Sequence, residues 1–173
     1  MTYDKSALDD LFSLAYEELR RLAATVHGDQ ASATLSPTAL VHEAWLKLAG
    51  SESFAATSPL HFKRIAARAM RQVLVDAARR RNAEKRGGGA ALVTFDDALE
   101  VPDATAADVL ALDAALEGLA RVSPRQAQLV ESRFFGGLEV RETAALLDVS
   151  EATVLRDWRA ARAWLSRALR QAC

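Results

Sequence analysis

The amino-acid sequence predicts an all-α protein, and three observations favour this fold class. Serine precedes proline at three sites, where serine can cap free backbone N–H groups and proline fits the first helical turn. These pairs are Ser36-Pro37, Ser58-Pro59 and Ser123-Pro124. Downstream of them, apolar residues recur at the i, i+3, i+4, i+7 spacing of amphipathic helices. Gly50 and Gly136-Gly137 then stand where two of these helices should end.

Seven helices are expected along the chain, and they fall into two modules. The predicted ranges are 6–26, 37–49, 59–85, 107–120, 124–135, 140–147 and 151–170. A triple glycine at 87–89 breaks the pattern after the third helix, and an acidic stretch follows. We therefore predict a three-helix module at 1–86 and a four-helix module at 107–173, joined by a flexible acidic linker at 87–106.

The charge of the whole chain conceals an asymmetry along the sequence. The 173 residues contain 22 Lys plus Arg and 23 Asp plus Glu, which gives a formal net charge of −1. Residues 1–90 and 121–173 each carry a net charge of +3, whereas residues 91–120 carry seven acidic residues and no basic one. The seven are Asp96, Asp97, Glu100, Asp103, Asp108, Asp113 and Glu117. Both basic ends are therefore candidates for binding a polyanion.

Composition and motifs disfavour several other classes of protein. Cys173 is the sole cysteine, so it forms no internal disulfide, which fits a reducing cytoplasm. No signal peptide is visible, and no apolar run approaches the roughly 18 residues of a membrane span. His42-Glu43 begins the H-E-x-x-H zinc-hydrolase motif, but Leu46 stands where the second histidine is needed. We expect a cytoplasmic protein with no membrane partner, catalytic residue, metal or cofactor.

The predicted helix at 59–85 is strongly basic. Between residues 63 and 86 there are nine basic and two acidic residues, a net charge of +7. The arginines that lie beside its apolar stripe are Arg64, Arg68, Arg71, Arg79 and Arg80. Arginine suits bidentate contact with phosphates, although such a row is also compatible with a solvated helix face. In the loop before this helix, Phe54 either stacks on an unpaired base or fills the core.

The segment at 140–170 fits a helix-turn-helix. Ala144 is small enough for close helix packing, and Ser150 is placed to cap the second helix. Leu147 and Val149 fill the seam, and Val154, Trp158, Ala161 and Leu165 form the core face of the second helix. The opposite face carries Thr153, Arg156, Arg159 and Arg162. In DNA-binding helix-turn-helix proteins this face reads base edges and contacts phosphates, and the alternative is a purely structural helix pair.

Four segments are distinctive in combination. They are 36–48 (SPTALVHEAWLKL), 66–81 (AARAMRQVLVDAARRR), 133–137 (RFFGG) and 154–165 (VLRDWRAARAWL). Together they resemble bacterial RNA polymerase sigma factors of the extracytoplasmic-function group, over nearly the whole chain. The resemblance implies transcription initiation as the function, with core RNA polymerase and promoter DNA as partners. An anti-sigma factor or another regulator is a further candidate partner.

The resemblance also implies a role for each segment. The helix at 37–49 matches the part that docks on the polymerase, and the residues concerned are Leu40, Val41, Glu43 and Trp45, with Lys47 as a further candidate. The basic helix and its preceding loop match the part that melts the downstream (minus ten) promoter element, where Asp76 joins the arginines. The helix-turn-helix matches the reader of the upstream (minus thirty-five) element. Simple core packing is the alternative interpretation of the apolar residues at 37–49.

Two residues depart from the family pattern. Leu155 stands where the family often has lysine, so one phosphate contact is expected to be missing. Asp148 replaces the usual glycine of the turn, and aspartate tolerates the left-handed conformation better than most residues. Both changes affect the expected preference for the upstream element.

The acidic linker has two candidate roles. The resemblance implies that it threads through the polymerase near the path of the nascent RNA. Alternatively, its acids fold back on the basic helix and screen DNA binding in the free protein. This screening is proposed for all seven acids of residues 91–120, and neutralising Asp96, Asp97, Glu100 and Asp103 tests it.

A stand-alone helix-turn-helix regulator is the main rival hypothesis. It accounts for the second module, but it leaves the basic helix and Trp45 without a role. Binding to core polymerase distinguishes the two, because an ordinary regulator of this kind is not expected to bind it.

Overall fold

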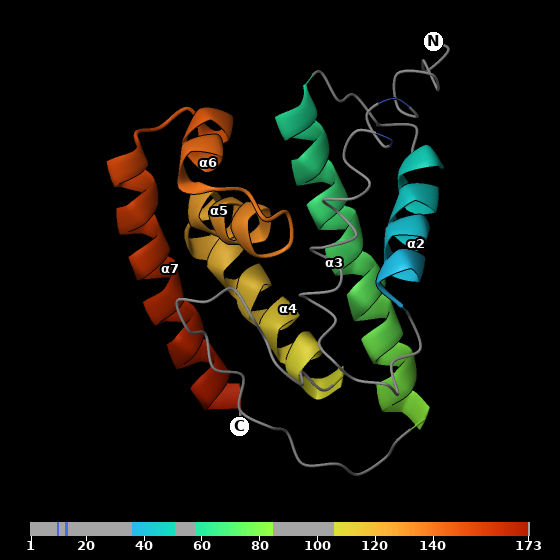
Figure 1. Cartoon of the computed structure of the whole chain (residues 1–173). Helices are drawn as coiled ribbons and strands as arrows, with labels where there is room; N and C mark the ends of the chain where they lie inside the picture. Colours follow the sequence, from blue (N-terminus) through green and yellow to red (C-terminus); the bar gives the residue numbers. More distant parts are fainter. Residues whose placement is uncertain (1–9, 11–12, 14–35, 51–57, 85–105, 173) are drawn as a thin grey trace.

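The computed structural model describes residues 10, 13, 36–50, 58–84 and 106–172, and its elements are all helices (Figure 1). They are α2 (Pro37–Ala49), α3 (Pro59–Glu84), α4 (Ala106–Val122), α5 (Pro124–Phe134), α6 (Val140–Leu147) and α7 (Glu151–Ala172). The described part of the chain contains no strand, so the predicted all-α class is confirmed. Except for residues 10 and 13, the predicted helix at 6–26 lies outside the described residues, as do Phe54 and the linker up to residue 105.

The serine caps form at two of the three predicted positions. The Ser36 and Ser58 hydroxyls accept hydrogen bonds from the backbone N–H groups of Ala39 and His61, both at 3.2 Å. Ser123 makes no such bond, so the prediction is wrong at the start of α5. There the helix begins at Pro124 without a side-chain cap.

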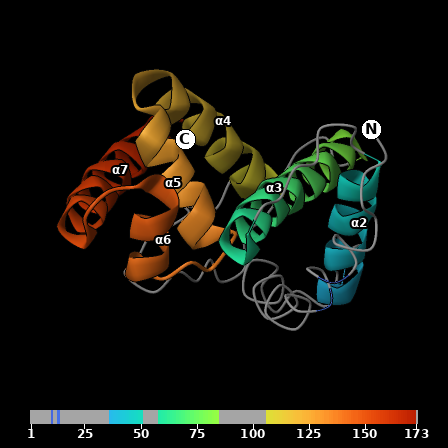
Figure 2. The same cartoon turned by 90° about the horizontal axis from the view of Figure 1, so that it is seen from above.

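Helix α3 lies in the middle of the molecule, between α2 on one side and the helices α4–α7 on the other (Figure 2). Against α2 it buries a cluster of apolar side chains. Those from α2 are Leu40, Val41, Ala44 and Leu48, and those from α3 are Phe62, Ala66, Ala69, Met70 and Val73. Helices α4, α5 and α7 form the second cluster, centred on Leu116, Leu119, Leu129, Val130 and Leu165.

Helix α3 also belongs to the second cluster. Ala67 is fully buried in it, and Leu74 packs against both clusters. A Cβ atom added at Gly136, after α5, would lie 3.2 Å from the Ala67 Cβ atom, so the two helical groups touch at close range. The two predicted modules therefore pack directly on each other, while their boundary at 87–106 stays a prediction.

Candidate nucleic-acid interfaces

The helix-turn-helix is built from α6, a three-residue turn and α7. Asp148 adopts the left-handed conformation, with φ 52° and ψ 50°, and the N–H of Val149 donates to the carbonyl of Ala144 at 3.0 Å. The hydroxyl of Ser150 accepts from the N–H of Thr153 at 3.2 Å and so caps α7. Aspartate thus supplies the turn conformation for which glycine is more usual. The predicted cap and turn are confirmed.

The inner face of α7 is fixed in the core. Val154, Ala161 and Leu165 are fully buried, and Trp158 is nearly so. Asp157 is also buried, and its carboxylate accepts from the Arg125 guanidinium of α5, 2.7 Å away at the closest approach. This contact ties α7 to the start of α5, and therefore holds the outer face of α7 in a defined orientation.

A second arginine supports the inner face from α5. The Arg133 guanidinium lies over the Trp158 ring, 4.5 Å from its centroid, which is the geometry of a cation–π contact. Burial lowers the pKa of this guanidinium below its ordinary value. Arg133 stands in the RFFGG segment, and its contact with Trp158 was not predicted.

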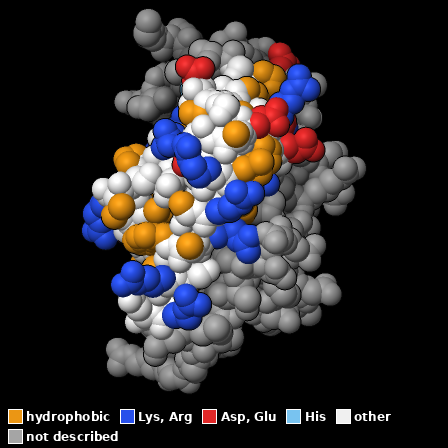
Figure 3. Space-filling model, turned by 90° about the vertical axis from the view of Figure 1, so that its left-hand side faces the viewer, with side chains coloured by type: hydrophobic (Ala, Val, Ile, Leu, Met, Phe, Trp, Pro, Cys, Tyr) orange, Lys and Arg blue, Asp and Glu red, His pale blue; other side chains and the backbone are white. Residues whose placement is uncertain are grey.

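The outer face of α7 presents arginine to solvent. Arg156 has a side-chain exposure of 72 %, and Arg159 is exposed as well. Thr153 and Arg162 are half-buried, and the Thr153 hydroxyl lies 2.9 Å from that of Ser150. Leu155 is 41 % exposed on the same helix. On the side of the molecule where α7 lies, Lys and Arg side chains spread between hydrophobic ones (Figure 3).

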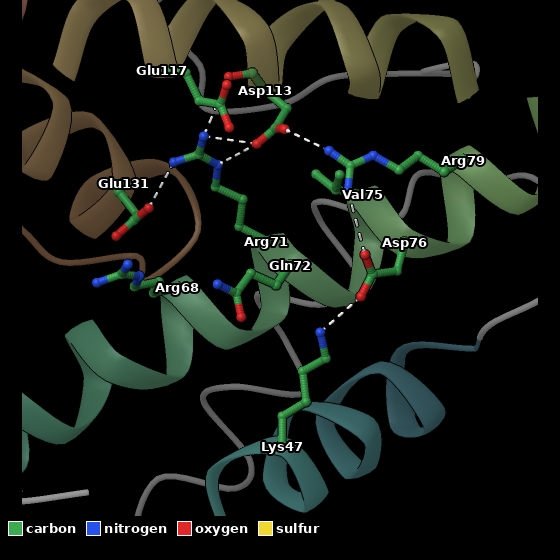
Figure 4. Close-up of a pocket in the computed structure, with 10 residues that line it drawn as sticks. All are labelled: Lys47, Arg68, Arg71, Gln72, Val75, Asp76, Arg79, Asp113, Glu117 and Glu131. Atoms are coloured by element: carbon green, nitrogen blue, oxygen red, sulfur yellow. Dashed lines mark hydrogen bonds and ion pairs between the residues drawn. The ribbon is translucent and has the colours of Figure 1, made fainter. Parts of the chain in front are cut away.

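The arginines of α3 are in a different environment, and Arg71 is the clearest case (Figure 4). Its guanidinium donates to the Asp113 carboxylate of α4, with Nε and Nη2 lying 2.9 Å and 2.7 Å from Oδ1. Nη1 lies 2.9 Å from Oε2 of Glu131 on α5, and Nη2 also donates to the Asp113 carbonyl at 3.3 Å. The three side chains are only 12 % to 16 % exposed. One arginine therefore joins α3 to two helices of the second module.

The neighbouring side chains extend this contact along α3. Lys63 lies 3.2 Å from Glu142, and the other Glu142 oxygen accepts from the Glu139 N–H in the capping box of α6. Arg79 is 63 % exposed and lies 3.9 Å from Asp113, too far for a hydrogen bond. A pocket of about 470 Å³ opens beside these groups, between α3 and α4. It is lined by charged residues of both signs.

The remaining predicted residues of α3 are spread around it. Arg68 and Arg80 are exposed, and Arg64 is half-buried. Asp76 pairs with Lys47 of α2, with 2.7 Å between Oδ2 and Nζ. The structure therefore does not place all of these residues on a common open surface.

A comparison with models of known protein families shows to which family the chain belongs. A model of the ECF sigma factor family matches residues 2–171. The chain belongs to the ECF sigma factor family. This family comprises sigma factors of RNA polymerase, which act in transcription initiation and are not enzymes. Searches of curated proteins and of solved structures gave no significant match.

Promoter DNA and core RNA polymerase are accordingly the partners that the family implies for this sigma factor. None of the helices in the described part is long and apolar enough to cross a membrane. Among the described residues, no three His, Cys, Asp or Glu side chains gather as metal ligands would.

Helix α2 of the sigma factor differs from the predicted docking surface. Leu40 and Val41, 0 % and 1 % exposed, face the core between α2 and α3, so they offer no surface to a partner in this arrangement. Their burial is the physical consequence of α3 packing against the face of α2 that carries Leu40, Val41, Ala44 and Leu48. Trp45 is half-buried, and Glu43 is exposed. Leu46 is 61 % exposed, although it was not among the predicted docking residues.

The acids that engage Arg71 were also missed as site residues. Asp113 is one of the seven acids proposed to fold back on the basic helix, but no partner was predicted for it, and the four acids chosen for the test, Asp96, Asp97, Glu100 and Asp103, lie outside the described residues. One signal was present in the sequence: Asp113 stands beside the apolar stripe of its helix, next to Leu112 and three residues before Leu116. Glu131 stands in the same way next to Val130 and three residues before Phe134.

Proposed function

We propose that this sigma factor binds core RNA polymerase and directs it to promoters by reading two DNA elements with its two modules. The observation that carries the proposal is the outer face of α7. A family match over residues 2–171 coincides with a capped helix-turn-helix whose second helix turns Arg156 and Arg159 to solvent. Arginine at these positions suits guanine edges and phosphates in a major groove.

In this proposal α7 reads the upstream element as duplex DNA. Arg156 and Arg159 make the principal contacts, and the half-buried Thr153 and Arg162 contact DNA from the margins of the face. Fixing α7 through the Asp157–Arg125 pair supports this role, because a recognition helix must be held rigidly to discriminate bases.

Helix α3 and the loop before it act on the downstream element. Its exposed arginines, among them Arg68 and Arg80, are suited to contact phosphates. Arg64, Arg71, Asp76, Arg79 and Phe54 complete the proposed set. The engagement of Arg71 with the second module means that the full set is not available in the arrangement described here.

The polymerase contact is proposed for the outer face of α2. Leu46 supplies exposed apolar surface there, and Glu43 stands three residues earlier on the same helix. Half-buried Trp45 and exposed Lys47 flank them, while Leu40 and Val41 support the face from inside. A location in the cytoplasm and regulation by an anti-sigma factor or another protein belong to the same proposal.

Transcription in vitro tests the proposal. The protein is combined with core RNA polymerase and a library of promoter sequences, and the transcripts and their start sites are sequenced. Transcripts that depend on the protein and share an upstream and a downstream element are expected. DNA binding without polymerase binding would instead favour a stand-alone regulator.

The polymerase contact on α2 has a matched control. Leu46→Asp is expected to weaken binding to core polymerase, because a charge replaces the exposed apolar side chain. Val122→Asp makes the same change at a side chain 71 % exposed at the end of α4. The affinity of core polymerase for each fluorescently labelled variant of the protein is measured. Equal losses in both variants, or none in Leu46→Asp, would remove the contact from this face.

A further inference from the structure

Leu155 is an apolar side chain beside the arginine face of α7. It is 41 % exposed, whereas the residue before it, Val154, is fully buried. Val154 and Trp158 belong to the apolar core of the second module, and Leu155 lies outside that core. Its neighbours Arg156 and Arg159 are exposed as well. Packing inside the protein therefore does not require a leucine at this position.

The start of α7 sets the depth at which Leu155 meets DNA. The Ser150 cap and the left-handed turn at Asp148 fix where the helix begins. Residues four apart lie on the same side of a helix, so Leu155 stands one turn before Arg159 at the edge of the outer face. Ala152, exposed and small, leaves space one turn before Leu155. Because the N-terminal residues of such a helix contact base edges, Leu155 on the second turn is placed against bases.

The major groove offers a leucine side chain one complementary group. Leucine has no donor or acceptor, so against a polar base edge it would exclude water without replacing the lost hydrogen bonds. Thymine presents an apolar group in this groove, its C5 methyl. Contact between that methyl and a leucine removes both from water, which favours binding.

We propose that Leu155 selects thymine at one position of the upstream element by contacting the C5 methyl group of that base. The inference rests on the proposed reading of this element by α7, and it names one base that the helix reads. Lysine, which the family often has at this position, would contact a phosphate whatever the sequence. Leucine replaces that contact with one that depends on the base. This chain is therefore expected to accept a narrower set of upstream elements.

The first experiment identifies the upstream element. The complex of the protein with core RNA polymerase selects promoter duplexes from a library randomised in the upstream region, and the bound sequences are determined. A constant position with thymine on one strand is expected. In Leu155→Ala that position alone should lose its preference, and α7 stays folded because both residues are strong helix formers.

Val122→Ala is the matched control for this selection. It shortens another exposed apolar side chain of the second module, 71 % exposed at the end of α4. Because Val122 lies outside α7, the control variant is expected to select the same element as the parent protein.

The second experiment removes only the methyl group. Each thymine of the selected element is replaced in turn by deoxyuridine, which lacks the C5 methyl and keeps the same hydrogen-bonding groups. At one position the replacement should weaken binding of the parent complex about fourfold, the effect of losing one buried methyl group. Leu155→Ala and Leu155→Gln should bind both promoters equally. Leu155→Met should keep the difference, because it retains an apolar side chain of similar volume.

Salt separates this contact from a phosphate contact. An apolar contact releases no counterions, so the ratio of the two affinities should stay constant as the salt concentration rises. Leu155→Lys should show a steeper salt dependence on both promoters and no difference between them, even where its phosphate contact raises both affinities at low salt.

The outcomes distinguish this contact from the proposed function on which it rests. An upstream element without a constant thymine, or with none whose replacement weakens the parent complex, would overturn the contact. The same methyl effect in Leu155→Ala as in the parent would assign it to another residue and overturn it too. A selection that yields no upstream element would remove the reading role of α7 itself, and this contact with it.

Discussion

Helices α7 and α3 carry similar rows of arginine, yet the two rows face different surroundings. On α7 the arginines lie on the side away from the core, and the buried acid of the helix, Asp157, pairs with Arg125 of its own module. On α3 the central arginine, Arg71, turns toward the other module and is held by two carboxylates. The spacing of arginines along a helix therefore does not establish that they are accessible.

The difference arises from acids distant in the sequence. Arginine at three- and four-residue spacing places side chains on one face of an isolated helix. Whether that face meets solvent depends on how helices α4 and α5 pack, and their packing follows from apolar residues such as Leu116 and Leu129. Local pattern fixes the face of the helix, and tertiary packing determines its partner.

Removing the arginines of α7 is expected to have the largest effect on DNA binding. Arg156→Ala with Arg159→Ala should weaken binding to a duplex carrying the upstream element by roughly 100-fold, if each side chain contributes a base or phosphate contact. Fluorescence anisotropy measures this loss. Binding to core polymerase should be unchanged, because neither residue lies on α2.

The control for this prediction removes the same charge from the same helix. Arg167 and Arg170 are exposed near the end of α7, and Arg167→Ala with Arg170→Ala is expected to cost much less affinity. A similar loss of DNA affinity in both double variants would mean that α7 binds DNA through its overall charge rather than through the outer face that carries Arg156 and Arg159.

Separating α3 from the second module without changing any charge is expected to have an intermediate effect. Ala67→Leu inserts a larger side chain where the two modules touch, and overpacking of this kind costs about 1–3 kcal/mol of unfolding free energy. Urea unfolding measures the cost, and Ala120→Leu at an exposed position of α4 is the control. Duplex binding through α7 should survive. A parallel loss of that binding would show that α7 depends on the contact with α3.

The same contrast explains how much the sequence revealed. Helix bounds, the turn at Asp148 and the core face of α7 follow from capping residues and periodicity, which act within a few residues. The burial of Val41 and the partners of Arg71 depend on contacts between distant segments. Leu46, which stands in place of the second histidine of the zinc motif, was not predicted as a docking residue, and it is exposed because α3 packs on another face of α2. The sequence thus predicted the elements and the exposed arginines, while the surfaces that α3 covers required the structure.

Adding one charge to α7 is expected to have the smallest effect on DNA binding of the changes considered. Leu155 is 41 % exposed beside the arginine face, at the position where the family often has lysine. Leu155→Lys should restore one phosphate contact, so the slope of log affinity against log salt should steepen by about 0.9 for the duplex element. Affinity at low salt should rise a few-fold.

Leu46→Lys adds the same charge to an exposed leucine of α2 and should leave the slope unchanged, because α2 is not expected to meet duplex DNA. An equal change in both variants would mean that the added charge attracts DNA at long range. The outer face of α7 would then not differ from the rest of the surface in its contact with DNA.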